Sequence, residues 1–172
     1  MDLFGMLSRT PAILARVAPQ VPAELVRVRS GPFALVEHVW QMADLEREFA
    51  ERIRRLLGEA DPFLPDFDGE GVAKERQYLT LDLAAGLAAF ASSREETLRR
   101  LGGVAFEAWA RPGRQEGIGA VSLAEMPGRI LDHDRAHLNE IADLLSDLVP
   151  AHPMIAELRG LAQGGPKSSK AA

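Results

Sequence analysis

Apolar residues recur every three or four positions through residues 123–148, which predicts a long amphipathic helix. The positions that face one side are Leu123, Met126, Ile130, His133, His137, Ile141, Leu144 and Leu148. A second helix, predicted over residues 32–57, shows the same pattern with Leu35, His38, Met42, Leu45, Phe49, Ile53 and Leu56. Three of the four histidines in the chain therefore lie inside apolar stripes.

Two further helices follow from the same periodicity. Residues 3–17 form the first, where Pro11 should introduce a kink or mark the true start, because proline lacks an N–H and clashes with the preceding turn. Residues 72–101 form another, which ends at Gly102 and Gly103. Ser122 and Glu125 make a capping box at the start of the last long helix.

The connections carry no pattern of their own. Residues 59–71 read as a long loop and residues 104–121 as a long crossover. The acidic residues of the first lack the spacing of an EF-hand, and Gly117 and Gly119 of the second follow no strand, so neither indicates a calcium or phosphate loop.

Four long amphipathic helices without alternating strands predict an all-α fold, an antiparallel four-helix bundle with long crossover loops. We assign residues 1–149 to this bundle and residues 150–172 to a short helix, at about 154–161, followed by a disordered tail from residue 164. The length of 172 residues, with 47% hydrophobic and 26% charged residues, suits one globular domain with a substantial core.

Charge and composition exclude several classes of function. A net charge of −5 without clustered lysine or arginine argues against a nucleic-acid partner. No apolar run is long enough to predict a targeting segment or a membrane span. Cysteine is absent, which excludes thiolate ligands and fits a cytoplasmic location. Any metal must be bound by histidine and carboxylate.

The histidines are the candidate metal ligands. His133 and His137 are four residues apart, so their side chains are neighbours on one helix face, and His38 can reach them from the facing helix. Three imidazoles leave coordination positions open for water or substrate. The alternative is that each buried ring only hydrogen-bonds within the core. Burial without a partner costs roughly 1–3 kcal/mol per ring, and this cost favours a metal.

Neighbouring polar residues add little at this stage. The pair is not an HExxH protease motif, because Asp134 stands where glutamate is required. We expect solvent exposure or a role in orienting a ring for Asp44, Asp132 and Asp134, a solvated face for Glu37 and Gln41, and a surface position for His152.

Two segments resemble the DinB-like superfamily of bacterial four-helix proteins: LVEHVWQMADLE at residues 35–46 and HDRAHLNEI at residues 133–141. The resemblance implies a divalent metal bound by His38, His133 and His137. It also implies thiol-dependent transfer or isomerisation, because the family includes bacillithiol transferases and the metal-binding domain of mycothiol-dependent maleylpyruvate isomerase. Dimerisation through the bundle is common in the family, and the residues themselves neither favour nor oppose a homodimer here.

We therefore expect a metal-dependent enzyme in which the ion activates a low-molecular-weight thiol or water for attack on a small-molecule electrophile. Zinc or nickel is expected first, with iron or manganese as further candidates, since imidazole suits several of these ions. Two alternatives stay open. One is a non-catalytic metal-binding stress-response protein, and the other is a metal-dependent hydrolase.

Overall fold

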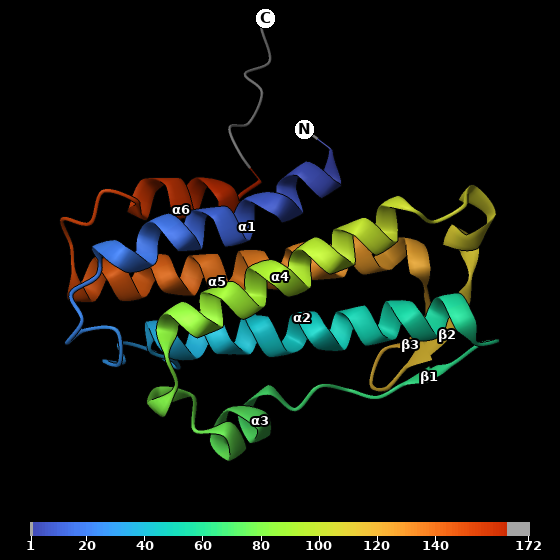
Figure 1. Cartoon of the computed structure of the whole chain (residues 1–172), viewed down its shortest axis with the longest axis horizontal. Helices are drawn as coiled ribbons and strands as arrows, with labels where there is room; N and C mark the ends of the chain where they lie inside the picture. The colour runs from blue at the N-terminus through green and yellow to red at the C-terminus, as the bar shows by residue number, and fades with distance from the viewer. Residues whose placement is uncertain (1, 165–172) are drawn as a thin grey trace, which may run out of the picture.

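The computed structural model describes residues 2–164 and consists of long helices with a small sheet at one end (Figure 1). The four long helices are α1 (Leu3–Val17), α2 (Leu35–Gly58), α4 (Leu83–Gly102) and α5 (Met126–Leu148). The predicted all-α four-helix bundle is confirmed. Among the described residues, none of the helices combines the length and the apolar character that crossing a bilayer demands.

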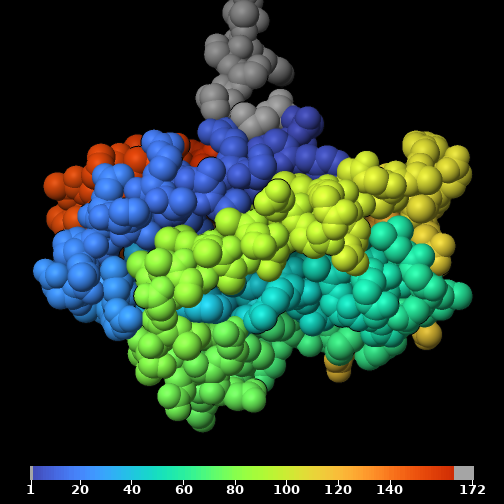
Figure 2. Space-filling view, in the orientation of Figure 1, coloured from blue at the N-terminus to red at the C-terminus, as the bar shows by residue number. Residues whose placement is uncertain are grey.

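The helices are arranged so that α1 and α2 occupy opposite corners of the bundle. Each of them packs against both α4 and α5. Figure 2 shows α4 lying diagonally across one face, with the segment that carries α3 (Gly69–Arg76) projecting beside α2. The face between α2 and α5 therefore lies on the far side of the molecule from α4 in Figure 1.

Capping residues define where the first long helix, α1, and the last one, α5, begin. Asp2 caps α1 by accepting a hydrogen bond from the Gly5 N–H at 2.6 Å, so Pro11 lies inside the helix and does not mark its start. The predicted capping box is present, with Glu125 accepting from the Ser122 N–H at 2.6 Å. One turn of 3-10 helix, η4 (Leu123–Glu125), separates this box from α5.

The helix predicted over residues 72–101 is instead divided into α3, the 3-10 turn η2 (Tyr78–Thr80) and α4. Gln77 ends α3 in the left-handed conformation with φ 52°. Asp82 then starts α4 afresh by accepting a hydrogen bond from the Ala85 N–H at 2.7 Å. The prediction was wrong here because the apolar period runs across the break without interruption.

The two long connections are joined by a three-stranded sheet that the sequence pattern did not predict. β1 (Phe63–Leu64) pairs in parallel with β2 (Pro112–Gln115), and β2 pairs antiparallel with β3 (Gly119–Ser122). The remaining crossover forms the 3-10 helix η3 (Phe106–Ala110). Strands of two to four residues are too short to show an alternating pattern.

The core is built from two apolar clusters. One surrounds Met42, Phe90 and Leu138, and the other surrounds Leu7, Phe49 and Ile130. The helix α6 (Ile155–Ala162) packs on α5 and adds Leu158, which is fully buried, to the first cluster. The predicted tail lies outside the described residues except for Gly164.

A layer of buried polar residues connects all four long helices, and we call it the polar layer. It consists of Thr10, Glu46, Arg94 and Asp134. Arg94 donates hydrogen bonds to Asp134 at 2.7 and 2.9 Å and to Glu46 at 2.8 Å. Thr10 donates to Asp134 at 2.7 Å. Because these groups pair with one another at all their polar atoms except Glu46 Oε1 and Arg94 Nε, the bundle tolerates them in its core.

Candidate metal centre

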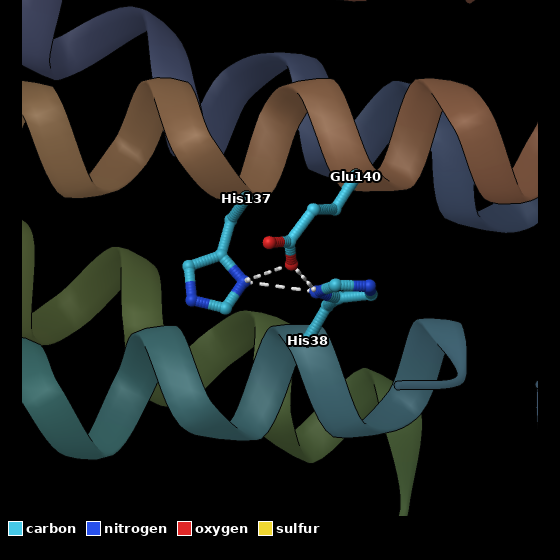
Figure 3. A group of neighbouring side chains, drawn as sticks. All are labelled: His38, His137 and Glu140. Atoms are coloured by element: carbon cyan, nitrogen blue, oxygen red, sulfur yellow. Dashed lines mark hydrogen bonds and ion pairs between the residues drawn. The ribbon is translucent and has the colours of Figure 1, made fainter. Parts of the chain in front are cut away.

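Three metal-binding side chains meet between α2 and α5. His38 extends from α2, and His137 and Glu140 extend from α5 toward it (Figure 3). The two Nδ1 atoms of the histidines are 2.8 Å apart, and the Glu140 Oε2 lies 3.6 Å from the His38 Nδ1 and 4.0 Å from the His137 Nδ1. One atom from each side chain thus lies within 4.8 Å of the other two.

His133 lies directly beside this group. Its ring centroid is 4.4 Å from that of His137, with the ring planes at 63°. Within the described part of the chain its ring nitrogens make no hydrogen bond. We call His38, His133, His137 and Glu140 the histidine site. The structure brings the three predicted residues together and adds a carboxylate, and the predicted three-histidine ligand set stays a prediction.

Local structure fixes the height of His38 on α2. The Glu37 carboxylate accepts a hydrogen bond from the Ala34 N–H at 2.8 Å, which holds the first turn of the helix. Arg29 donates to the same carboxylate at 2.6 Å. The ring of Phe33 packs edge-on against the His38 ring, with 5.5 Å between centroids. His38 therefore enters the site from a well-anchored helix start.

Burial keeps the imidazoles neutral. Burial lowers the pKa of His38 to about 3, with a smaller contribution from His137 that Glu37 opposes. Burial, and then the neighbouring His133, lower the pKa of His137 to about 3. Burial and the positive charge of Arg94 lower the pKa of His133 to about 4. Burial, and then Asp143, raise the pKa of the Glu140 carboxyl. Neutral imidazoles have the free lone pair that a metal requires.

The comparison with protein families agrees with this arrangement. A sequence model of the DinB superfamily matches residues 6–141. The chain belongs to the DinB superfamily. The solved structure of YfiT from Bacillus subtilis, described as a probable metal-dependent hydrolase with an unusual four-helix bundle topology, is similar to this DinB chain with a TM-score of 0.78 and 18% identity. The match covers 84% of this chain and 85% of YfiT. No curated protein matches.

Several polar residues of this DinB protein do not lie where the sequence suggested. Three carboxylates are buried, because each accepts a hydrogen bond from an arginine: those of Glu37, Asp44 and Asp134. His152 was expected at the surface and is only 5% exposed, with its Nδ1 accepting from the Met154 N–H at 3.2 Å. Only Asp132 is exposed as expected. None of the three aspartates hydrogen-bonds a ring of the histidine site within the described residues.

Glu140 is the site residue that sequence reasoning missed. It follows His137 by three positions, which places both side chains on one face of α5. This HxxE spacing was visible in the sequence, but an acidic residue at a helix edge usually faces solvent. Its side chain is 43% exposed, so Glu140 forms the border between the buried rings and the surface.

The donor atoms suit a divalent metal. Two buried Nδ1 atoms face each other and a carboxylate oxygen lies nearby, and imidazole with carboxylate is a typical environment for zinc, nickel or iron. His133 adds a further imidazole whose nitrogens have no partner among residues 2–164. The residues present therefore fit a divalent metal ion.

Proposed function

We propose that this DinB protein is a metal-dependent enzyme that activates a small nucleophile for attack on a small-molecule electrophile. The observation that carries the proposal is the convergence of the His38 and His137 Nδ1 atoms and the Glu140 carboxylate at a buried point. A divalent ion bound there supplies Lewis-acid chemistry, because it lowers the pKa of a coordinated water or thiol.

The residues of the histidine site would have two roles, metal binding and proton transfer. His38 and His137 would hold the ion, with either His133 or Glu140 as the third ligand. Whichever of His133 and Glu140 does not bind the ion would lie beside it, where an imidazole or a carboxylate can accept a proton from the nucleophile. The position of Glu140 at the surface border suits it to proton exchange with solvent.

Water and a low-molecular-weight thiol are the two candidate nucleophiles. The similarity to YfiT, described as a probable metal-dependent hydrolase, supports water. The resemblance of residues 35–46 and 133–141 to the DinB-like superfamily, which includes thiol transferases, supports a thiol. We further propose a homodimer, on family grounds, and a cytoplasmic location, because the chain has no cysteine.

Metal analysis of ligand variants tests the proposal. We expect untagged protein to contain about one metal ion per chain, and His38→Ala and His137→Ala to lose it, because each removes a nitrogen from the site. Metal affinity should fall by more than about a hundredfold in both, since even residues outside the coordination sphere change it about 10–100-fold. His152→Asn is the matched control, because asparagine keeps the acceptor for the Met154 N–H.

The same preparations decide the third ligand and the nucleophile. Either His133→Ala or Glu140→Gln should weaken metal binding as strongly as His137→Ala does. Turnover of activated esters alone supports water, and turnover that requires an added thiol supports thiol transfer. A protein that binds no metal after reconstitution with zinc, nickel, iron and manganese would refute the proposed function.

A further inference from the structure

Arg129 lies beside the histidine site without being part of it. It precedes His133 by four residues on α5, so the two side chains are neighbours on the same side of the helix. His133 in turn packs on His137, which meets His38 of α2. Arg129 therefore lies one helical turn before His133 and two turns before His137 on α5.

The guanidinium of Arg129 has no hydrogen-bond acceptor among the described residues. Its nearest carboxylate oxygen, Oε1 of Glu125, is 3.6 Å away, which is beyond hydrogen-bond distance. The other oxygen of Glu125 is already used, because it accepts bonds from the N–H and the hydroxyl of Ser122. The Arg129 Nε is buried and has no hydrogen-bond partner within residues 2–164, although the side chain forms an ion pair with Glu125 and is 27% exposed as a whole.

A buried N–H without an acceptor is unfavourable for an arginine side chain. A guanidinium carries five N–H donors, and a buried donor without an acceptor destabilises the folded protein. Arg94, which is more deeply buried, makes four hydrogen bonds from its terminal nitrogens. The terminal nitrogens of Arg94 are thus paired within the protein, whereas Arg129 makes only its ion pair with Glu125 among the described residues, and the Nε of each arginine lacks a partner there.

A second polar side chain without a printed hydrogen bond, Gln41, lies on the facing helix. Gln41 follows His38 by three residues on α2, so it flanks the site on the other side. Its Oε1 is buried and has no partner within residues 2–164. Gly69 lies against the same amide, where an added Cβ would come within 2.6 Å of the Gln41 Nε2. The chain entering α3 therefore holds Gln41 in place.

We propose that Arg129 binds an oxyanion group of the substrate, a carboxylate or a phosphate, while another part of the same molecule reacts at the metal centre. The planar fork of a guanidinium matches both oxyanions in a bidentate geometry. The Nε2 of Gln41, which carries two N–H donors, would supply a second contact to the oxyanion from α2. This inference rests on the proposed function and adds the substrate class, a small molecule with an anionic group.

Binding of paired ligands to nickel-loaded protein tests the assignment. Butyrate carries one carboxylate, succinate carries a second, and 3-phosphonopropionate carries a phosphonate in its place. We expect wild-type protein to bind at least one of the two doubly functional ligands about tenfold more tightly than butyrate, because a charge-assisted pair contributes roughly that factor. Arg129→Met should abolish this preference, and Arg129→Lys should restore part of it.

Arg135→Met is the matched control. Arg135 lies on the same helix and its side chain is 30% exposed. Its Nε is also buried without a partner among the described residues, and the carboxylate of Asp132 is 3.7 Å away. It differs in position, since it follows His133 by two residues and faces away from the site, toward Gly164. The Arg135→Met protein should keep the wild-type preference.

The outcomes separate this inference from the function on which it rests. Metal content is measured first in every variant and should be unchanged in Arg129→Met. A wild-type protein that binds nickel but shows no preference for the doubly functional ligands, or an Arg129→Met variant that keeps it, overturns the oxyanion assignment alone. A wild-type protein that binds no metal overturns the proposed function and this inference together. Preference for succinate or for 3-phosphonopropionate identifies the oxyanion.

Discussion

The polar layer and the histidine site place polar groups in the same core in opposite ways. In the polar layer, Arg94 makes four hydrogen bonds and Thr10 adds another to Asp134. In the histidine site, one contact of 2.8 Å joins two rings, and His133 makes no hydrogen bond within the described part of the chain. The first cluster is satisfied by the protein itself at all its polar side-chain atoms except Glu46 Oε1 and Arg94 Nε, which have no partner within residues 2–164. The second has ring nitrogens without a protein partner among the described residues, as expected of a site that binds a ligand.

The largest expected effect is a loss of stability on acidification, which the histidine site should cause. The pKa values of His38 and His137 are about 3 and that of His133 is about 4, whereas the unfolded chain has the ordinary value of 6.5. Below pH 6.5 the unfolded state therefore binds protons that the folded state does not bind, so stability is complete above that pH and is lost as the pH falls toward 4. Between pH 7 and pH 5 we expect the free energy of unfolding to fall by about 2 kcal/mol for each ring.

Urea unfolding of chelator-treated protein at the two pH values measures this loss. The double variant His133→Leu, His137→Leu, which completes the apolar stripe of α5, should lose less stability on acidification than the wild type. Equal losses in the two proteins would show that the rings are not the cause.

Removing the guanidinium of the polar layer should have the next largest effect. Arg94→Met leaves the carboxylates of Glu46 and Asp134 buried without their cation, and breaking a buried ion pair costs about 3–5 kcal/mol. Urea unfolding at pH 7 measures the change. Arg99→Met removes an arginine that is 72% exposed and should leave stability unaltered. A stability loss in Arg94→Met of less than about 1 kcal/mol would contradict this account of the polar layer.

Thr10→Val should have the smallest effect of the three. The variant keeps the shape of the side chain and removes one hydrogen bond of 2.7 Å to Asp134, which Arg94 continues to pair. We expect a loss of about 1 kcal/mol in urea unfolding. Metal content should be unchanged, because Thr10 belongs to the polar layer alone. Loss of metal in this variant would mean that the two clusters are coupled.

The same contrast explains what the sequence could predict. Histidines stand out in an apolar stripe, so His38, His133 and His137 could be identified from periodicity and brought together by the bundle. Arg94, Glu46 and Asp134 could not, because charged residues on a helix usually face solvent and their partners are 40 and 48 residues apart. Pairing at that distance depends on the tertiary arrangement.

Backbone features were hidden for a related reason. The break at Gln77 depends on one left-handed residue, a conformation that glutamine rarely adopts. β1 is two residues long and exists only because β2, about 50 residues later, pairs with it. The amphipathic helices carry their own signal, whereas such short elements acquire their structure from a distant partner.

The turn between β2 and β3 offers a place to open or extend the chain. Gly117 and Gly119 adopt φ values of 72° and 101°, and Ile118 between them is 54% exposed. The sheet that holds this turn lies beside the end of α2, whereas His38 lies near the beginning of that helix (Figure 1). A fluorescent domain, a surface tether or new chain termini introduced at Ile118 should therefore report on or immobilise the protein while the two buried polar clusters stay undisturbed.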